Sequence, residues 1–262
     1  MPDLHLRLEE TEAEEASPPP LLDDDDAIAL LSRAEISGET LVPWGSNYTF
    51  AVALQPEGAD RIEQFGIYKP KRGERPLWDF PSQTLYQREW ASWLLARELG
   101  WHIIPPTVVR RGPHGVGSLQ LYLAPKEDAL DRDEALEYWS QVSPVMEQIA
   151  LFDLIANNAD RKLTHLLEDQ HGRIRGIDHG LTFSTVPKLR TVLWQFSGEC
   201  ICDAQIEAMA RVRNDEDRLR EVLRPALTPE EIQATIDRMD SLLAGRRHPW
   251  LDPNVNIPYG WW

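Results

Sequence analysis

The segments NNADRKLTH, residues 157–165, and IDHG, residues 177–180, carry two aspartates that decide how this sequence is interpreted. Asp160 follows a predicted helix over 144–156, whose apolar residues recur on one face. Asp178 ends the stretch 165–178, in which an Asp-Gln-His-Gly turn predicts a two-stranded hairpin. Such a hairpin folds both carboxylates toward one cleft. Paired carboxylates suit phosphoryl transfer, because one can orient or deprotonate an acceptor while the other binds Mg²⁺.

Phosphoryl transfer by a kinase makes further demands on the residues upstream. A lysine on the third strand should pair with a glutamate in the helix that follows it. Lys69 lies in the predicted third strand, 64–70, and Glu89 lies in a predicted helix that begins at Ser82 and ends before Gly100. The two residues therefore have the required order and element types.

Two more segments fit the same scheme. The turn at 44–47, Trp-Gly-Ser-Asn, joins two β-rich runs within 41–54 and offers small residues to cover nucleotide phosphates. The apolar strand SLQLYL, residues 118–123, stands where a hinge strand would meet adenine. Each feature alone occurs by chance in many proteins, but their shared order is a stronger signal.

The distribution of predicted elements favours an α+β fold of two lobes, similar to protein kinases. A short helix capped by Asp26 and a run of strands place a β-rich N-lobe at 27–125. A mostly helical C-lobe follows at 126–262, with helices over 129–141 and 144–156. Its last helix begins at Thr228, with proline and glutamate in the positions of a capping box, and runs to about residue 244.

These motifs resemble the phosphatidylinositol 3/4-kinase-like superfamily, especially type II phosphatidylinositol 4-kinases, and also HipA-type kinases. The chain is similar above all to a family of bacterial phosphatidylinositol kinase-like proteins. The segments that carry the resemblance are YKPKRGERP (68–76), REWASWLL (88–95), PPT (105–107), GSLQLYL (117–123), NNADR (157–161), IDHGLTF (177–183) and KLRTVLW (188–194).

The resemblance implies an ATP-dependent atypical kinase that transfers the γ-phosphate to a hydroxyl acceptor on a protein, a lipid or a small metabolite. ATP and Mg²⁺, or Mn²⁺, are the expected cofactors. Asp160 would be the catalytic aspartate, Arg161 would support its loop, and Asp178 would hold the metal. The nucleotide would be bound by Gly45, Ser46 and Asn47 at the phosphates, by Lys69 with Glu89 holding it, and by the hinge residues Gln120, Leu121 and Tyr122.

His165 departs from the kinase pattern, which places a metal-binding asparagine five residues after the catalytic aspartate. Imidazole is a poor ligand for Mg²⁺, which prefers oxygen. Either one metal suffices, or Mn²⁺ is used, or His165 has another task, such as contacting a phosphate or supporting the loop. The chain also lacks a Gly-rich G-x-G-x-x-G turn. Two alternatives therefore stay open: a nucleotide-binding pseudokinase or scaffold, and an enzyme that transfers AMP.

Other polar residues near the two aspartates have structural interpretations as well. His179 is expected to give packing or polar support, and Asn157 and Asn158 to hold the loop backbone. Lys188 and Arg190 could meet an acidic or phosphorylated acceptor, or their segment could simply dock onto the C-lobe.

Charge and composition exclude several classes of function. The net charge is −16, and residues 1–26 read as a disordered acidic leader. An acidic body argues against nucleic-acid binding. No apolar run approaches the roughly 20 residues that span a bilayer, and the N-terminus lacks a secretory h-region. We therefore expect a cytoplasmic protein without an integral membrane segment, with Cys200 and Cys202 reduced.

Overall fold

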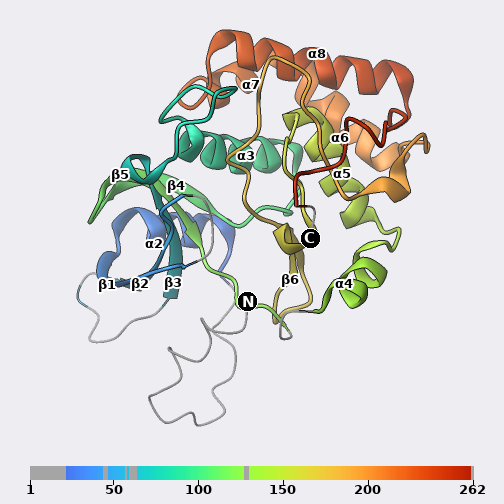
Figure 1. Ribbon diagram of the computed structural model, residues 1–262. Helices are drawn as coiled ribbons and strands as arrows, with labels where there is room; N and C mark the ends of the chain where they lie inside the picture. The colour runs from blue at the N-terminus through green and yellow to red at the C-terminus, as the bar shows by residue number, and fades with distance from the viewer. Residues whose placement is uncertain (1–21, 44–46, 57, 59–63, 127–129, 261–262) are drawn as a thin grey trace.

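The protein is described here by a computed structural model that covers residues 22–43, 47–56, 58, 64–126 and 130–260. An antiparallel five-stranded sheet has the order β1-β2-β3-β5-β4. Figure 1 shows this sheet on one side of the molecule and most helices on the other. The strands are β1 (Glu35–Leu41), β2 (Phe50–Gln55), β3 (Gln64–Pro70), β4 (Thr107–Gly112) and β5 (Gly115–Leu121).

Helix α2 (Asp24–Arg33) covers one face of the sheet. It begins earlier than the sequence analysis predicted, because Asp23 rather than Asp26 is the N-cap and accepts the N–H of Asp26 at 2.8 Å. The first turn of α2 thus lies within the predicted leader, whose residues 1–21 are outside the described part of the chain. The apolar core between helix and sheet contains Ala27, Leu31, Ala34, Val52, Leu54, Tyr68, Val108, Leu119 and Leu121.

Helix α3 (Leu85–Leu99) lies between the sheet and the helices of the second half of the chain (Figure 1). It is buried around most of its circumference for that reason. Thr84, not Ser82, occupies the N-cap position, while Gly100 ends the helix in the left-handed conformation, with φ of 71°. A residue without a Cβ is favoured there. The helix can therefore present side chains both to the sheet and to the helical half.

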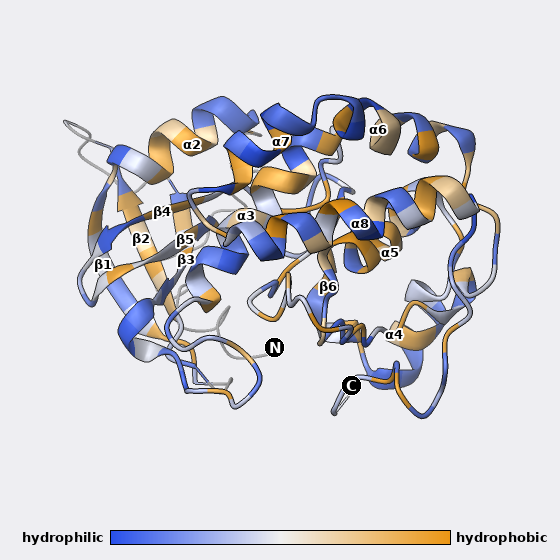
Figure 2. Ribbon diagram, turned by 90° about the horizontal axis from the view of Figure 1, so that it is seen from above, coloured by the Kyte–Doolittle hydropathy of each residue, from blue (hydrophilic) through white to orange (hydrophobic). Residues whose placement is uncertain are grey.

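The second half of the chain is helical apart from one hairpin. Figure 2 shows hydrophobic residues along α5 beside α8, two helices that pack together. The predicted bounds of α5 are confirmed, while α4 is shorter than predicted. The elements are α4 (Arg132–Trp139), α5 (Pro144–Ala156), α6 (Asp203–Asn214), α7 (Glu216–Leu223), α8 (Pro229–Gly245), β6 (Leu166–Glu168), β7 (Ile174–Gly176), and the 3₁₀ turns η1 (Lys71–Gly73), η2 (Leu163–His165) and η3 (Trp194–Phe196).

The capping box predicted at the start of α8 is confirmed. Thr228 accepts the N–H of Glu231 at 3.3 Å, and Glu231 accepts the N–H of Thr228 at 3.0 Å. The α+β arrangement of a strand-rich half followed by a helical half is confirmed as well. The division at residues 125 and 126 stays a prediction. Within the described residues, no helix combines the length and the apolar character needed to cross a membrane.

Candidate active site

Three elements meet at the side chain of Lys69, which stands on β3. Its ammonium forms one ion pair with Glu89 of α3 and another with Oδ1 of Asp178, at 2.9 Å, in the loop after β7. Glu89 is buried, and its Oε2 accepts the backbone N–H of His179 at 3.0 Å. The structure thus brings together the lysine and the glutamate that the sequence paired, and adds the second aspartate to them.

The charges at this junction are coupled. The Lys69 ammonium holds the pKa of the Asp178 carboxyl well below its usual range. Burial opposes the charge of Lys69, but the two carboxylates raise the pKa of its ammonium above the ordinary value. Burial raises the pKa of Glu89, against the pull of Lys69. At neutral pH the junction therefore holds a charged lysine and an ionised Asp178, groups that suit a phosphate and a metal cation respectively.

Asp178 has an uncommon backbone conformation. Its φ of 58° lies in the left-handed region, which residues with a side chain seldom adopt. Such a conformation costs on the order of 1–3 kcal/mol and persists where the surroundings over-determine it. About half of the Asp178 side chain is exposed. The turn thus directs an ionised carboxylate toward solvent beside Lys69.

Asp160 follows α5 in a loop held by its neighbours. Its backbone N–H donates to Oδ1 of Asn158 at 3.0 Å, and its carboxylate forms an ion pair with Lys162 at 2.9 Å. Burial raises the pKa of Asp160, although Lys162 opposes this, and Asp178 also acts to raise it. The two aspartates named by the sequence therefore influence each other electrostatically, as expected if they face one cleft.

Arg161 is fully buried and ties the loops of the site together. Its guanidinium binds Asp153 of α5 through two hydrogen bonds, of 2.8 and 2.9 Å. Nη1 donates to the backbone carbonyls of His165 and Ile177, each at 3.1 Å. Nη2 lies 2.7 Å from Nε2 of His179. Because a guanidinium can only donate, that nitrogen of His179 accepts. His179 is polar support, and Arg161 fixes the segments on which both aspartates stand.

His165 lies beside Asp178, with its Nε2 3.4 Å from Oδ2 of the carboxylate. Burial lowers the pKa of the His165 ring to about 4, so the ring is neutral at physiological pH. Among the described residues, no cluster of three or more His, Cys, Asp or Glu side chains is placed to hold a metal. The pair nevertheless fits a divalent cation that takes its remaining ligands from phosphate oxygens and water. One carboxylate with one imidazole suits Mn²⁺ better than Mg²⁺.

The predicted nucleotide contacts have mixed outcomes. Gly45 and Ser46 lie outside the described residues. The side chain of Asn47 is engaged elsewhere, since its Oδ1 accepts the N–H of Arg75 at 2.8 Å. In the predicted hinge, the Gln120 side chain is buried and donates to Oγ1 of Thr107 at 2.9 Å.

The backbone N–H groups of the other two hinge residues are also used within the protein. Leu121 donates to the carbonyl of Pro106 at 2.9 Å, and Tyr122 donates to that of Phe65 at 3.0 Å. Neither amide is available to adenine unless these bonds break. The predicted role of these residues therefore stays a prediction, and their amides do not support it.

The segment after Asp178 contacts residues 78–79 and the loop after α5. Its Lys188 forms an ion pair with Asp79 at 2.8 Å and lies over the Trp78 ring, 5.3 Å from the centroid. The interpretation of Lys188 as a free contact for an acidic acceptor is therefore not supported by this geometry. Arg190 pairs through its backbone with the loop after α5, accepting from the N–H of Arg161 at 3.0 Å and donating to the carbonyl of Asn158 at 2.9 Å.

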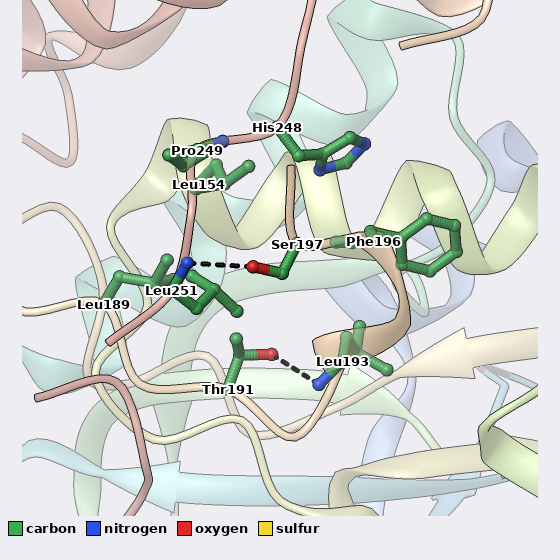
Figure 3. A pocket seen from close by; sticks show the side chains of 10 residues that line it. Leu154, Leu189, Thr191, Leu193, Phe196, Ser197, His248, Pro249 and Leu251 are labelled. Carbon is green, nitrogen blue, oxygen red and sulfur yellow. Dashed lines mark hydrogen bonds between the residues drawn. The ribbon is translucent and has the colours of Figure 1, made fainter. Parts of the chain in front are cut away.

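A small cavity lies farther along the same segment. It is enclosed by α5, residues 189–197 and the chain near His248, and Figure 3 shows its mainly apolar lining. Thr191 Oγ1 accepts the N–H of Leu193 at 3.1 Å, and Ser197 Oγ accepts that of Leu251 at 2.9 Å. The free space is about 10 Å³, enough for a single water molecule. A cavity of this size is a small packing defect between these segments and cannot hold a substrate.

Sequence reasoning missed two residues of the site. Asp153, fully buried, anchors both Arg161 and Asn158. Its signal was a lone carboxylate in the otherwise apolar run LFDLIA, since a buried charge requires a partner. Lys162, the partner of Asp160, had no signal of its own, because a lysine in a loop is ordinarily solvated.

Solved structures confirm the kinase-like two-lobed fold. The Golgi casein kinase with Mn/ADP bound is 13% identical, with a TM-score of 0.51, over 88% of this chain and 80% of that one. The proinflammatory kinase CtkA of Helicobacter pylori is 10% identical, with a TM-score of 0.51, over 83% of this chain and 94% of that one. Identities this low establish the fold alone.

Closer kinship is found in sequence. No family model matches the chain. Protein Rv2133c of Mycobacterium tuberculosis strain H37Rv is 36% identical, over 74% of this chain and 81% of the relative. At this identity and coverage, the chain belongs to the same family as protein Rv2133c.

Proposed function

We propose that this protein is an ATP-dependent phosphotransferase, an atypical kinase that passes the γ-phosphate of ATP to a hydroxyl acceptor. The observation that carries the proposal is the junction of Lys69, Glu89 and Asp178, which come from three different elements, with Asp160 nearby. The fold is that of known kinases, one of which was solved with Mn and ADP. Kinase chemistry is mostly positioning and charge stabilisation, and this junction supplies both.

Each residue has a definite task in this mechanism. Lys69, oriented by Glu89, contacts the α- and β-phosphates. Asp178 and His165 would hold the divalent cation, which would neutralise charge on the phosphates. Asp160 orients the acceptor hydroxyl and receives its proton, and its raised pKa improves it as a base. Arg161, anchored by Asp153, holds the loops that carry Asp160 and Asp178 in fixed positions.

The finer points of the proposal rest on sequence motifs. The relationship to phosphatidylinositol 3/4-kinase-like proteins is supported by the segments around Lys69, Asp160 and Asp178. The proposed acceptor is a hydroxyl group on a protein, a lipid or a small metabolite. The cytoplasmic location belongs to the proposal as well.

Turnover of labelled ATP tests the proposal directly. We expect the purified protein, with Mn²⁺ or Mg²⁺, to release or transfer the label of γ-labelled ATP. With α-labelled ATP, the label should stay on the nucleotide and be recovered in ADP. Transfer of the α label to an acceptor would identify an AMP-transferring enzyme instead. If ATP raises the Tm of the protein but neither label leaves ATP, the protein is a nucleotide-binding pseudokinase.

The pseudokinase is the second candidate because one observation favours it. Lys162 already forms an ion pair with the Asp160 carboxylate, and Lys69 forms one with Asp178. These ion pairs must be exchanged before Lys69 or Asp160 can contact a substrate. The retained set of Lys69, Glu89, Asp160 and Asp178 favours activity over this alternative.

His165 should set the metal preference of the enzyme. With His165→Asn, an oxygen ligand replaces imidazole nitrogen beside Asp178, which favours the harder Mg²⁺. We expect the ratio of Mg²⁺- to Mn²⁺-supported turnover to rise by about tenfold, the low end of effects seen when a metal's surroundings change. His171→Asn, in the exposed turn between β6 and β7, is the matched control. An unchanged ratio in a folded His165→Asn protein would remove His165 from the metal site.

A further inference from the structure

A recess of about 310 Å³ lies beyond the end of β3, beside the candidate active site. Four segments line it: η1, the end of β4, the start of β5, and Gln83, two residues before α3. Ser118 of β5 pairs with Lys69, and Val116, two residues earlier, lines the recess. Residues two apart on a strand share a face. The recess therefore lies on the face of the sheet that carries Lys69. Its lining residues are Lys71, Arg72, Gln83, Arg111, Gly115 and Val116.

Three cations line this recess without acidic partners. None of Lys71, Arg72 and Arg111 forms an ion pair with another residue in the part of the chain that the structure describes. Glu74 feels the charge of Lys71 without forming an ion pair with it; its Oε1 accepts the backbone N–H of Tyr86 at 2.9 Å, and its buried Oε2 has no hydrogen-bond partner among the described residues. The chain as a whole has a net charge of −16. These three cations lie around one cavity without an ion pair from the described residues, and like charges held together repel one another unless an anion joins them.

Strand packing fixes part of the backbone around the recess. A Cβ at Gly117 would collide with the backbone of Lys69 and Pro70, so β5 packs directly against the residues before η1. A Cβ at Gly115 would meet nothing within 4 Å, which leaves space at the recess itself. Gln83 adopts φ of 64°, a strained conformation for a residue with a side chain. The fold thus sets the backbone around the recess, while the side chains of Arg72 and Arg111 are exposed.

We propose that this recess binds an anion that carries phosphate groups, held by Lys71, Arg72 and Arg111. Two guanidinium groups present planar forks that match phosphate oxygens, and a lysine adds a point charge. A phosphate monoester carries close to two negative charges at neutral pH, which suits three cations better than a single carboxylate does. None of the lining residues is among the nucleotide contacts proposed above, so the proposal does not depend on phosphoryl transfer.

Calorimetric titration with inorganic pyrophosphate tests the site. All proteins carry Lys69→Met, so that the nucleotide cleft contributes little to the signal. We expect binding that weakens as salt is added. Because each charge-assisted hydrogen bond contributes about tenfold or more in affinity, the triple variant Lys71→Ala, Arg72→Ala, Arg111→Ala should raise Kd by at least about 100-fold.

A second triple variant controls for the loss of three charges. Arg33, Arg211 and Arg224 are exposed and lie elsewhere on the surface, and their replacement by alanine should leave Kd within about twofold. Circular dichroism and Tm verify that both triple variants fold. Equal affinity in the two triple variants, or no binding by the parent protein, would overturn the proposal.

A vesicle arm distinguishes the source of the phosphate. Vesicles of phosphatidylcholine with and without phosphatidic acid are sedimented with the parent protein and the recess variant. Sedimentation that needs both phosphatidic acid and the three cations identifies a lipid headgroup. Pyrophosphate binding without sedimentation identifies a soluble phosphorylated ligand.

Discussion

Replacing Asp160 by asparagine should lower kcat for phosphoryl transfer by about 10²–10⁴-fold, the range that a positioned general base contributes. The carboxylate stands in a loop fixed by Asn158, beside the junction of Lys69 and Asp178. Asparagine keeps the size and polarity of the side chain but cannot accept the proton of the acceptor. The measurement is steady-state turnover of γ-labelled ATP at saturating nucleotide.

This change should affect stability little. The ion pair of Asp160 with Lys162 is partly exposed, and such pairs contribute about 0–1 kcal/mol. Tm should therefore stay close to that of the parent protein while turnover collapses.

Lys162→Gln is the matched control for this experiment. It removes the same ion pair and leaves the carboxylate in place, so most of the turnover should remain. Equal losses in Asp160→Asn and Lys162→Gln would show that the ion pair, not the base, matters. Turnover in Asp160→Asn at the level of the parent protein would exclude the catalytic role of Asp160.

Local sequence signals account for the elements that could be predicted. The strand 64–70 and the helix 144–156 have the bounds that the sequence predicts, because apolar periodicity and proline mark them. The capping box of α8 is local in the same sense, since Thr228 and Glu231 are three residues apart. Where several neighbouring residues can act as the N-cap, the predicted start of the helix was wrong by a few residues. Asp23–Asp26 are four competent caps in a row, and tertiary packing decides among them.

Edge strands and distant contacts were harder to predict. β1 starts at Glu35, before the predicted β-rich run, and most of its residues are exposed, so it lacks the alternation that marks a half-buried strand. The partner of Lys188 is Asp79, 109 positions away, and nothing local indicates that pair. Residue types and order were enough to name the lysine, the glutamate and the two aspartates. They were not enough to show that Asn47 and Gln120 are bound to the protein itself.

The pair of Arg161 and Asp153 should be the most sensitive point for stability. Arg161→Ala should lower the free energy of unfolding by about 3–5 kcal/mol, because it leaves the fully buried Asp153 carboxylate without its partner. Domains are commonly stable by only about 5–15 kcal/mol, so this loss is a large fraction of the total. Urea denaturation followed by circular dichroism measures it.

Two further variants separate the explanations for such a loss. The double variant Asp153→Leu, Arg161→Met removes both charges and fills the space with apolar atoms, so it should be less destabilised than Arg161→Ala. Arg218→Ala breaks the exposed pair with Glu98 and should cost no more than about 1 kcal/mol. Equal destabilisation of the single and double variants would show that lost packing, not an unpaired charge, dominates.

Activity adds a second readout for the same residue. Arg161 holds the carbonyls of His165 and Ile177, so its loss frees the segments that carry the side chains proposed to bind the metal. The double variant should therefore recover stability without recovering turnover, because leucine and methionine cannot donate those hydrogen bonds. A stable double variant with full turnover would mean that the aspartates hold their positions without the arginine. The separation of the two readouts is what distinguishes a positioning residue from one that only stabilises the fold.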